Sequence, residues 1–219
     1  MGGDRWDESR DRLDRLVAEN FSLQKIFTVH RIDRETSGLV VFAKNEEAHR
    51  RLSISFESRD VGKRYVAVVC GRPPWKEEAC DLPLVPNGNK QHMTIIDKFR
   101  GKKSFTRFVL LHGTGSYSVI EALPETGRTH QIRVHAAALG FPIACDSLYG
   151  TNQKLGEKPV LLSEIKKKWR GDPLEERPLL ARLGLHAAEL SLTTGDSVNL
   201  LRAPLPRDLS SLIKQIEKN

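Results

Sequence analysis

The segment KRYVAVVC, residues Lys63 to Cys70, is predicted to form a core strand of the fold. It is rich in β-branched residues and ends in a continuous apolar run, which is typical of a strand in the core of a sheet. A helical pattern precedes it at Asn45 to Ser58. Strand patterns follow it at Ser104 to Leu111 and at Tyr117 to Leu123. Turn residues separate the two later strands, so we expect them to form an antiparallel hairpin.

The N-terminal side of this segment is predicted to hold one helix and two strands. Residues Asp7 to Asn20 place leucine and valine at helical spacing among charges, which indicates an amphipathic helix. Ile26 to Val29 is a short strand candidate. Gly38 to Ala43, GLVVFA, is an unbroken apolar run that favours a strand buried on both faces.

On the C-terminal side, Thr129 to Leu139 has a helical composition, and Gly140 is placed to end the helix. We expect its core face to carry Ile132, Ala136 and Leu139. A different face would then carry His130, Arg133 and Ala137. The remaining predicted elements are strands at His92 to Asp97, Leu185 to Thr193 and Val198 to Leu201, and a helix at Leu209 to Glu217.

These elements predict an α+β fold, with a central, mixed but mostly antiparallel sheet flanked by helices and loops around a cleft. The length of 219 residues suits a single domain spanning 1–219. Within it, 1–25 is expected to be an N-terminal helical segment. The polar, proline-containing stretch 150–183 is expected to be a surface insertion.

Composition limits the classes of protein to which the chain can belong. Hydrophobic residues make up 39% and charged residues 29%, as in ordinary globular proteins. We find no apolar run long enough for a membrane span and no signal-peptide core, and the three cysteines form no Cys-x-x-Cys pair. We therefore expect a cytoplasmic monomer without membrane contact. The net charge of +7 favours a polyanionic partner such as RNA, although charge alone is a weak indication.

Three polar segments stand beside the apolar elements. They are HRIDRETSG at 30–38, KRY at 63–65 and TGRTHQIRVH at 126–135. Charged loops at the ends of rigid elements are common places for active sites. Together with GFPIACDSLYG at 140–150 and LGLHAAEL at 183–190, in this order, they resemble the RluA family of RNA pseudouridine synthases. The resemblance covers most of residues 27 to 192.

The resemblance implies a pseudouridine synthase fold and an isomerase that needs neither metal nor organic cofactor. Asp33 corresponds to the family's catalytic aspartate, Tyr65 to the tyrosine that stacks on the target base, and Arg133 to the arginine that pairs with the aspartate. The expected RNA-binding residues are Arg31, Arg34, Thr36, Arg128, His130 and Gln131. Of these, His130 and Gln131 are also expected to orient the helix and its loop. The expected partner is ribosomal RNA in preference to transfer RNA.

The residue types agree with this chemistry. Pseudouridine formation breaks the N1–C1′ bond, turns the uracil and joins C5 to C1′, so a carboxylate must attack the sugar or deprotonate C2′. Uracil departs as a delocalised anion, so no second carboxyl group is needed as an acid, unlike in glycoside hydrolysis. An arginine beside the carboxylate favours its charged form, and an aromatic ring can hold the free base.

Other interpretations of the same residues remain open. Asp33 between Arg31 and Arg34 could form a structural ion pair. The chain could bind RNA without catalysis, or it could release free uracil as a nucleosidase. The basic run Lys166 to Arg170 could contact RNA or be a solvated face. Relatives begin with an Asn-Lys-Pro-x-Gly block and often an S4-like domain. We do not find either in this sequence, which suggests a shortened form or a mis-assigned start.

Overall fold

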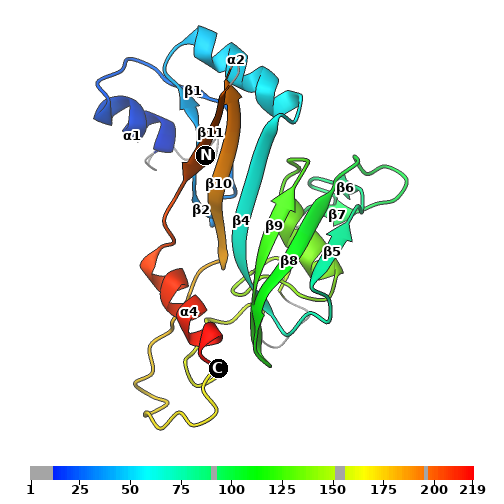
Figure 1. Ribbon diagram of the computed structural model, residues 1–219, viewed down its shortest axis with the longest axis vertical. Coiled ribbons are helices and arrows are strands. Elements are labelled where there is room, and N and C mark those ends of the chain that lie inside the picture. The colour runs from blue at the N-terminus through cyan, green and yellow to red at the C-terminus, as the bar shows by residue number, and fades with distance from the viewer. Residues whose placement is uncertain (1–11, 90–92, 151–155, 195–196) are drawn as a thin grey trace.

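The protein was analysed as a computed structural model that describes residues 12–89, 93–150, 156–194 and 197–219. Figure 1 shows an elongated molecule in which one twisted sheet runs between helices at either end. The described helices are α1 Leu13–Asn20, α2 Glu46–Glu57, α3 Gln131–Ala138 and α4 Arg207–Glu217. The two-residue strands outside the main sheet are β1 Phe27–Thr28, β3 Phe42–Ala43, β6 Leu84–Val85 and β7 Ile95–Ile96.

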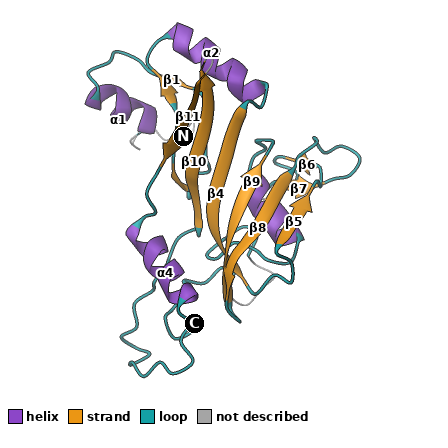
Figure 2. Ribbon diagram, viewed as in Figure 1, coloured by secondary structure: helices purple, strands orange, loops and turns teal. Residues whose placement is uncertain are grey.

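The main sheet has the strand order β11-β10-β4-β9-β8-β5, and every neighbouring pair on this path is antiparallel. Its strands are β4 Val61–Cys70, β5 Glu77–Cys80, β8 Thr106–Gly113, β9 Tyr117–Pro124, β10 Leu185–Thr194 and β11 Ser197–Arg202. A further strand, β2 Ser37–Gly38, pairs with β10 in parallel. The predicted α+β fold with a mixed, mostly antiparallel sheet is confirmed (Figure 2).

Strand β4 lies inside the sheet between β10 and β9, and the predicted core strand at Lys63 to Cys70 is confirmed. From Val66 to Cys70 its residues are buried, with Ala67, Val68 and Val69 fully inaccessible to solvent. Side chains on alternate positions enter two different apolar clusters, because successive residues of a strand point to opposite faces. The sheet is therefore covered on both sides along the second half of β4.

Two helices frame the region where the polar segments meet. Helix α2 begins at Asn45, whose side chain accepts a hydrogen bond from Ala48 N at 2.8 Å. Helix α3 ends before Gly140, whose φ of +87° is the left-handed conformation that stops a helix. Both helices lie close to their predicted bounds. For the helix predicted at Asp7 to Asn20, the part before residue 12 lies outside the described residues.

The prediction of one buried strand from Gly38 to Ala43 is wrong. The chain forms the separate strands β2 and β3, and the residues between them are only half-buried. Gly38 has a φ of +112°, and a Cβ atom there would lie 2.2 Å from the carbonyl oxygen of Ala187. This close approach to β10 bends the chain, so the apolar run cannot continue as one strand.

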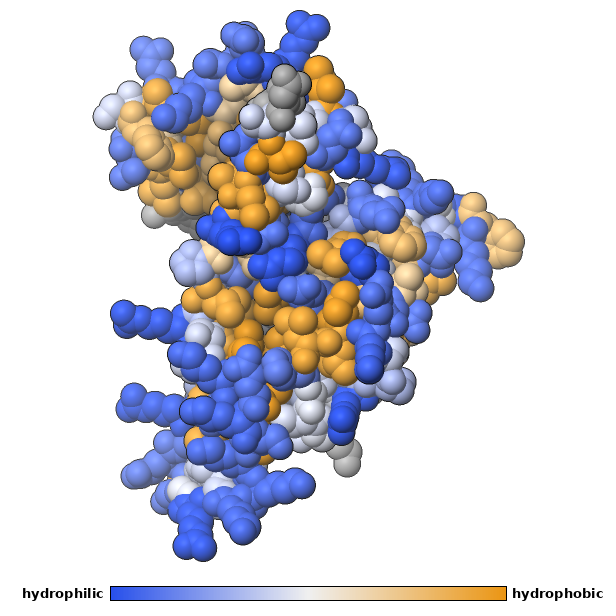
Figure 3. Space-filling model, viewed as in Figure 1, coloured by the Kyte–Doolittle hydropathy of each residue, from blue (hydrophilic) through white to orange (hydrophobic). Residues whose placement is uncertain are grey.

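The described part of the expected surface insertion, 156–182, contains no helix or strand beyond a bridge between Val160 and Leu180. Val160, Ile165 and Leu180 are nevertheless buried, and they join the cluster beneath helix α4. Its outer part is hydrophilic, as the lower end of the molecule shows in Figure 3. In the described residues, no helix is long and apolar enough to cross a membrane.

Candidate active site

The loop that carries Asp33 connects β1 to β2 and is fixed at both ends. Before Asp33, the Nε2 atom of His30 accepts a hydrogen bond from Val41 N at 3.0 Å, and the His30 ring stacks on Phe56. After Asp33, Thr36 N donates to the Asp33 carbonyl at 3.0 Å, which closes a turn. The pairing of β2 with β10 then holds the end of the loop against the sheet. Asp33 is thereby held at a defined place although it lies in a loop.

Arg133 on helix α3 is almost completely buried, at 2% side-chain exposure. Its Nε and Nη2 atoms donate two hydrogen bonds to the carboxylate of Asp146, at 2.8 and 2.7 Å. Burial opposes the charge of the guanidinium, but the hydrogen bonds and charge of Asp146 outweigh it and raise the pKa of Arg133. The expectation that Arg133 lies on a face away from the core is therefore wrong. The whole first turn and a half of α3 is buried, because Asp146 satisfies the arginine inside the protein.

The carboxylate of Asp33 lies near this pair without joining it tightly. Its Oδ2 atom is 3.7 Å from Nη1 of Arg133, and its side chain is 18% exposed. Glu35 also approaches Arg133, at 3.4 Å, but is largely exposed. The predicted proximity of Asp33 and Arg133 is thus present in the structure.

Tyr65 comes from the middle of β4, where it pairs with Ala122 on one side and Ala187 on the other. The register between β10 and β4 shifts directly after Ala187, and such irregularities often re-aim side chains beside active sites. Burial raises the pKa of Tyr65 to about 12, and the negative charge of Asp33 adds to the effect. The phenol is therefore neutral at physiological pH and close enough to Asp33 to feel its charge.

His130 precedes helix α3 and has a φ of +53°, which is unusual for a residue with a side chain. Its Nδ1 atom is 2.9 Å from the hydroxyl of Tyr149, which accepts a hydrogen bond from Thr94 N. Burial lowers the pKa of His130, so the ring is neutral. If Tyr149 donates its proton to Nδ1, the remaining N–H is on Nε2, which lies 3.9 Å from Asp33 Oδ1.

Gln131 fixes the loop before helix α3. Its Oε1 atom accepts hydrogen bonds from the Thr126 hydroxyl at 2.7 Å and from Arg128 N at 3.0 Å. Its Nε2 atom donates to Phe105 O and to the Thr106 hydroxyl, both at 2.9 Å. The amide of Gln131 is thus fully used inside the protein, which suits the expected orienting role.

These segments enclose a cleft of about 480 Å³ between the Asp33 loop, β4 and the 124–132 loop. Of the expected site residues, those that line it are Arg31, Asp33, Thr36, Tyr65, Arg128, His130 and Gln131. Arg133 lies behind this lining, and Arg34 is exposed outside it. The buried hydroxyl of Thr36 has no hydrogen-bond partner among the described residues. A cleft of this volume is typical of small-ligand sites.

Three residues of this site were not singled out from the sequence. Asp146 and Tyr149 both lie in the segment GFPIACDSLYG, which was the available signal in the sequence. Nothing in its pattern showed that Asp146 would contact Arg133 or that Tyr149 would contact His130. Lys63 lines the cleft two residues before Tyr65, and strand alternation could have placed the two on one face. In the described part of the chain, no three histidine, cysteine or acidic side chains cluster as metal ligands would.

Several known proteins are similar to this chain in sequence or in fold. The sequence pattern of a family described as RNA pseudouridylate synthase matches residues 1–138. A ribosomal large subunit pseudouridine synthase D of Zymomonas mobilis is 34% identical over 192 residues, covering 86% of this chain and 55% of that protein. An uncharacterised RNA pseudouridine synthase of the same organism is 38% identical over 166 residues, covering 73% of each protein. A ribosomal large subunit pseudouridine synthase C of Buchnera aphidicola is 35% identical over 190 residues, covering 86% of this chain and 56% of that protein.

The chain therefore spans a little over half the length of the two ribosomal large subunit synthases that it matches. Among solved structures, human RNA pseudouridylate synthase domain containing 4 superposes with a TM-score of 0.70 at 22% identity. That match covers 94% of this chain and 82% of the human one. Human RNA pseudouridylate synthase domain containing 1 gives a TM-score of 0.68 at 24% identity, covering 94% and 85%. These likenesses confirm the predicted fold.

Proposed function

This chain belongs to the RNA pseudouridylate synthase family, and from that premise we propose that it isomerises uridine to pseudouridine in RNA. The observation that carries the proposal is the position of Asp33 in a cleft that it shares with Tyr65, backed by the buried guanidinium of Arg133. The cleft is large enough for one nucleotide but not for a stacked strand. The uridine must therefore be extruded from its strand, at a cost of a few kcal/mol.

In the proposed reaction the N1–C1′ bond of uridine breaks, and uracil departs as an anion whose charge is spread over the ring. The carboxylate of Asp33 either bonds to C1′ or removes the C2′ proton. The uracil then turns, and C5 joins C1′. On the first route C5 displaces the carboxylate of Asp33 from C1′, and on the second route Asp33 returns its proton to C2′. The proton released from C5 ends on N1, so the product has the same mass as the substrate. Deuterium at C2′ distinguishes the two routes, because it slows the reaction only if that proton is removed.

Arg133 supports Asp33 in this reaction as a positioning residue. Its positive charge, 3.7 Å away, attracts the carboxylate without tying up both of its oxygens. Tyr65 provides a flat ring on which the detached uracil can stack while it turns. The neutral phenol adds no negative charge that would repel the uracil anion.

The cationic side chains that line the cleft would bind the RNA backbone. Arg31 and Arg128 line the cleft on opposite loops, and each can contact a phosphate. We further propose ribosomal RNA as the substrate in preference to transfer RNA, because two of the relatives are named as ribosomal large subunit pseudouridine synthases. We also propose that 1–219 acts as one catalytic domain and as a cytoplasmic monomer.

The test maps pseudouridine by carbodiimide labelling in total RNA from cells with and without the gene. We expect one or more sites to disappear on deletion and to return with the wild-type gene, but not with Asp33→Asn. In vitro, Asp33→Asn is expected to lower turnover by more than about a thousandfold. The control is Glu35→Gln, which removes a neighbouring, largely exposed carboxylate and should keep most of the activity.

Three results would contradict the proposal. Restoration of the lost sites by Asp33→Asn would show that the carboxylate is not needed. Release of free uracil would indicate a nucleosidase. RNA binding without any change in the RNA would indicate an RNA-binding protein that has kept the fold only.

A further inference from the structure

Lys63 is a half-buried cation that lines the cleft. It lies on β4 two residues before Tyr65, so the two side chains leave the same face of the strand. Both line the cleft, and Lys63 is only partly accessible to solvent. Its Nζ atom reaches the carbonyl oxygen of Thr126 at 3.5 Å, the upper limit of a hydrogen bond. The ammonium group is therefore held near the 124–132 loop by one weak contact.

Lys63 forms no ion pair among the residues that the structure describes. Three carboxylates line the same cleft, those of Asp33, Glu57 and Glu125, but none lies within 4.0 Å of Lys63 Nζ. Another lining cation, Arg59, is close enough to act on it, and burial together with Arg59 lowers the pKa of Lys63. Two neighbouring cations repel each other, and an anion bound between them would offset this repulsion.

The backbone beside Lys63 leaves room for such an anion. Apart from its own chain neighbours, a Cβ atom at Gly127 would meet only the Lys63 ammonium within 4 Å, at 3.9 Å. An ammonium group has three donors, and the Thr126 carbonyl uses one of them. The remaining donors can therefore be directed at a ligand in the cleft.

From this geometry we infer that Lys63, together with Arg59, binds a phosphodiester group next to the extruded uridine. The inference rests on the proposed function, because it takes the polyanion in the cleft to be RNA. A nucleotide pulled from its strand brings its two flanking phosphates to the mouth of the cleft. Lys63 holds one of them on the β4 side and thus offsets part of the cost of extrusion.

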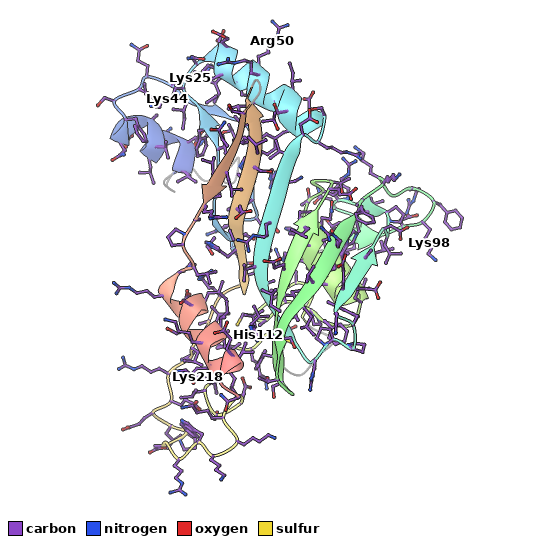
Figure 4. All side chains as sticks on the ribbon, viewed as in Figure 1. Lys25, Lys44, Arg50, Lys98, His112 and Lys218 are labelled. Carbon is purple, nitrogen blue, oxygen red and sulfur yellow. The ribbon has the colours of Figure 1, made fainter. Side chains whose placement is uncertain are left out.

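The experiment measures RNA affinity by fluorescence anisotropy across a salt series. The probes are oligouridylate and an oligonucleotide around the mapped uridine. The variant is Lys63→Met, which keeps the apolar stem and removes the charge. Lys63→Arg tests rescue by another cation. The matched control is Lys218→Met, which replaces an exposed lysine directly after α4. It lies at the opposite end of the molecule from α2, whose last turn lines the cleft (Figure 4). Thermal unfolding of each variant shows whether the fold is retained.

We expect Lys63→Met to weaken binding roughly tenfold at low salt. It should also reduce the slope of log affinity against log salt by about 0.7, the value for one phosphate contact on a single strand. Lys63→Arg should restore both, and Lys218→Met should change neither. If Lys63 served only to hold the 124–132 loop in place, its replacement could lower the affinity but would not change the slope of log affinity against log salt.

A second measurement has one arm that uses wild type alone and so does not depend on the variant folding. One of the two linkages beside the uridine is replaced by an uncharged methylphosphonate. Wild type should lose roughly tenfold in affinity for one of the two probes, and Lys63→Met should lose none. If wild type tolerates both substitutions, or if Lys63→Met keeps the wild-type salt slope, the inference is overturned. If wild type binds oligouridylate but makes no pseudouridine, the proposed function fails while the salt slope still decides the role of Lys63.

Discussion

Arg133 is approached by three carboxylates, but only one of them holds it tightly. Asp146, which is fully buried, takes both short hydrogen bonds. Asp33 stays 3.7 Å away, a distance at which it is attracted but not clamped. Because Asp146 satisfies the arginine, the carboxylate oxygens of Asp33 are not taken up by Arg133. In the proposed reaction this would leave Asp33 free to act on the ribose.

We predict that Asp146→Asn will lower the free energy of unfolding by about 3–5 kcal/mol, because it leaves a buried guanidinium without its charged partner. Activity should fall as well, since Arg133 would then be drawn onto Asp33. Urea denaturation of the variant measures the first effect. The control is Asp208→Asn, which breaks a bidentate pair with Arg182 that is about one-third exposed, and should cost no more than about 1 kcal/mol. Equal losses in the two variants would contradict this account of Arg133.

His30 makes the stability of the Asp33 loop dependent on pH. Burial, with a smaller effect of the positive charge of Lys63, lowers the pKa of His30 to about 4. Its Nε2 atom accepts a hydrogen bond from Val41 N, which only the unprotonated nitrogen can do. Below the ordinary histidine pKa of about 6.5 the unfolded chain binds the extra proton and the folded chain does not. The contribution of His30 is therefore complete above about pH 6.5 and is lost as the pH falls toward 4.

We expect wild type to lose up to about 2 kcal/mol of unfolding free energy from this source between pH 7 and pH 5. His30→Gln keeps an acceptor for Val41 N but does not titrate, so the difference between the two pH values should shrink. Urea denaturation at both pH values gives the comparison. An unchanged difference would show that His30 does not cause the pH dependence.

At the residue scale, the sequence predicted the meeting of Asp33 and Arg133 and the placement of Tyr65 in the same cleft, through three short motifs. It did not predict the burial of Arg133. Helical spacing assigns an arginine to the polar face, and the partner that makes its burial possible, Asp146, lies 13 residues away in another segment. The expected contact by Arg34 remains a prediction. Its side chain is exposed beside the cleft, where only an RNA complex can test it.

Strand β2 is only two residues long, yet it ties the Asp33 loop to the sheet. We predict that Gly38→Ala will lower the free energy of unfolding by about 1–3 kcal/mol. The φ of +112° is unfavourable for alanine, and the added Cβ atom would overlap the Ala187 carbonyl. Turnover should fall further than stability alone explains, because the loop would move away from β4.

The matched control for this prediction is Gly115→Ala in the turn before β9. A Cβ atom at Gly115 would meet nothing within 4 Å, so stability should change little or rise slightly. Thermal unfolding and pseudouridine formation are measured for both variants. A Gly38→Ala variant as stable and active as Gly115→Ala would show that the close approach of β2 to β10 is not needed.

At the element scale, helices α2 and α3 could be predicted within two residues because their end signals are local. The side chain of Asn45 caps one helix and the backbone of Gly140 ends the other. The strand predicted at Gly38 to Ala43 failed because the bend depends on a contact with Ala187, far along the chain. Strands β5 and β6 were missed because they are short and lack a clear alternation. Their pairing partners, not their own residues, make them strands.

At the scale of the whole molecule, positive charge is found both at the cleft and far from it. The cleft lies over the middle of the sheet, where β4, the Asp33 loop and the start of α3 meet. The segment 156–182 lies with α4 at one end of the molecule (Figure 1), and that end is hydrophilic (Figure 3). Its lysines, Lys166, Lys167 and Lys168, are exposed. An RNA bound only in the cleft would not reach them, whereas a long structured RNA could.

We therefore predict that the effect of replacing these three lysines by glutamine depends on the length of the RNA. For a strand of about eight nucleotides, which fills little more than one site, affinity and salt slope should stay at wild-type values. For a long ribosomal RNA fragment containing the mapped uridine, the slope of log affinity against log salt should fall by roughly one to three. Anisotropy titrations with both RNAs at several salt concentrations provide the measurement. If the long fragment also binds the variant with an unchanged slope, the basic run is a solvated face and the interface ends near the cleft. A change with the short strand would instead mean that the RNA path runs from Asp33 toward α4.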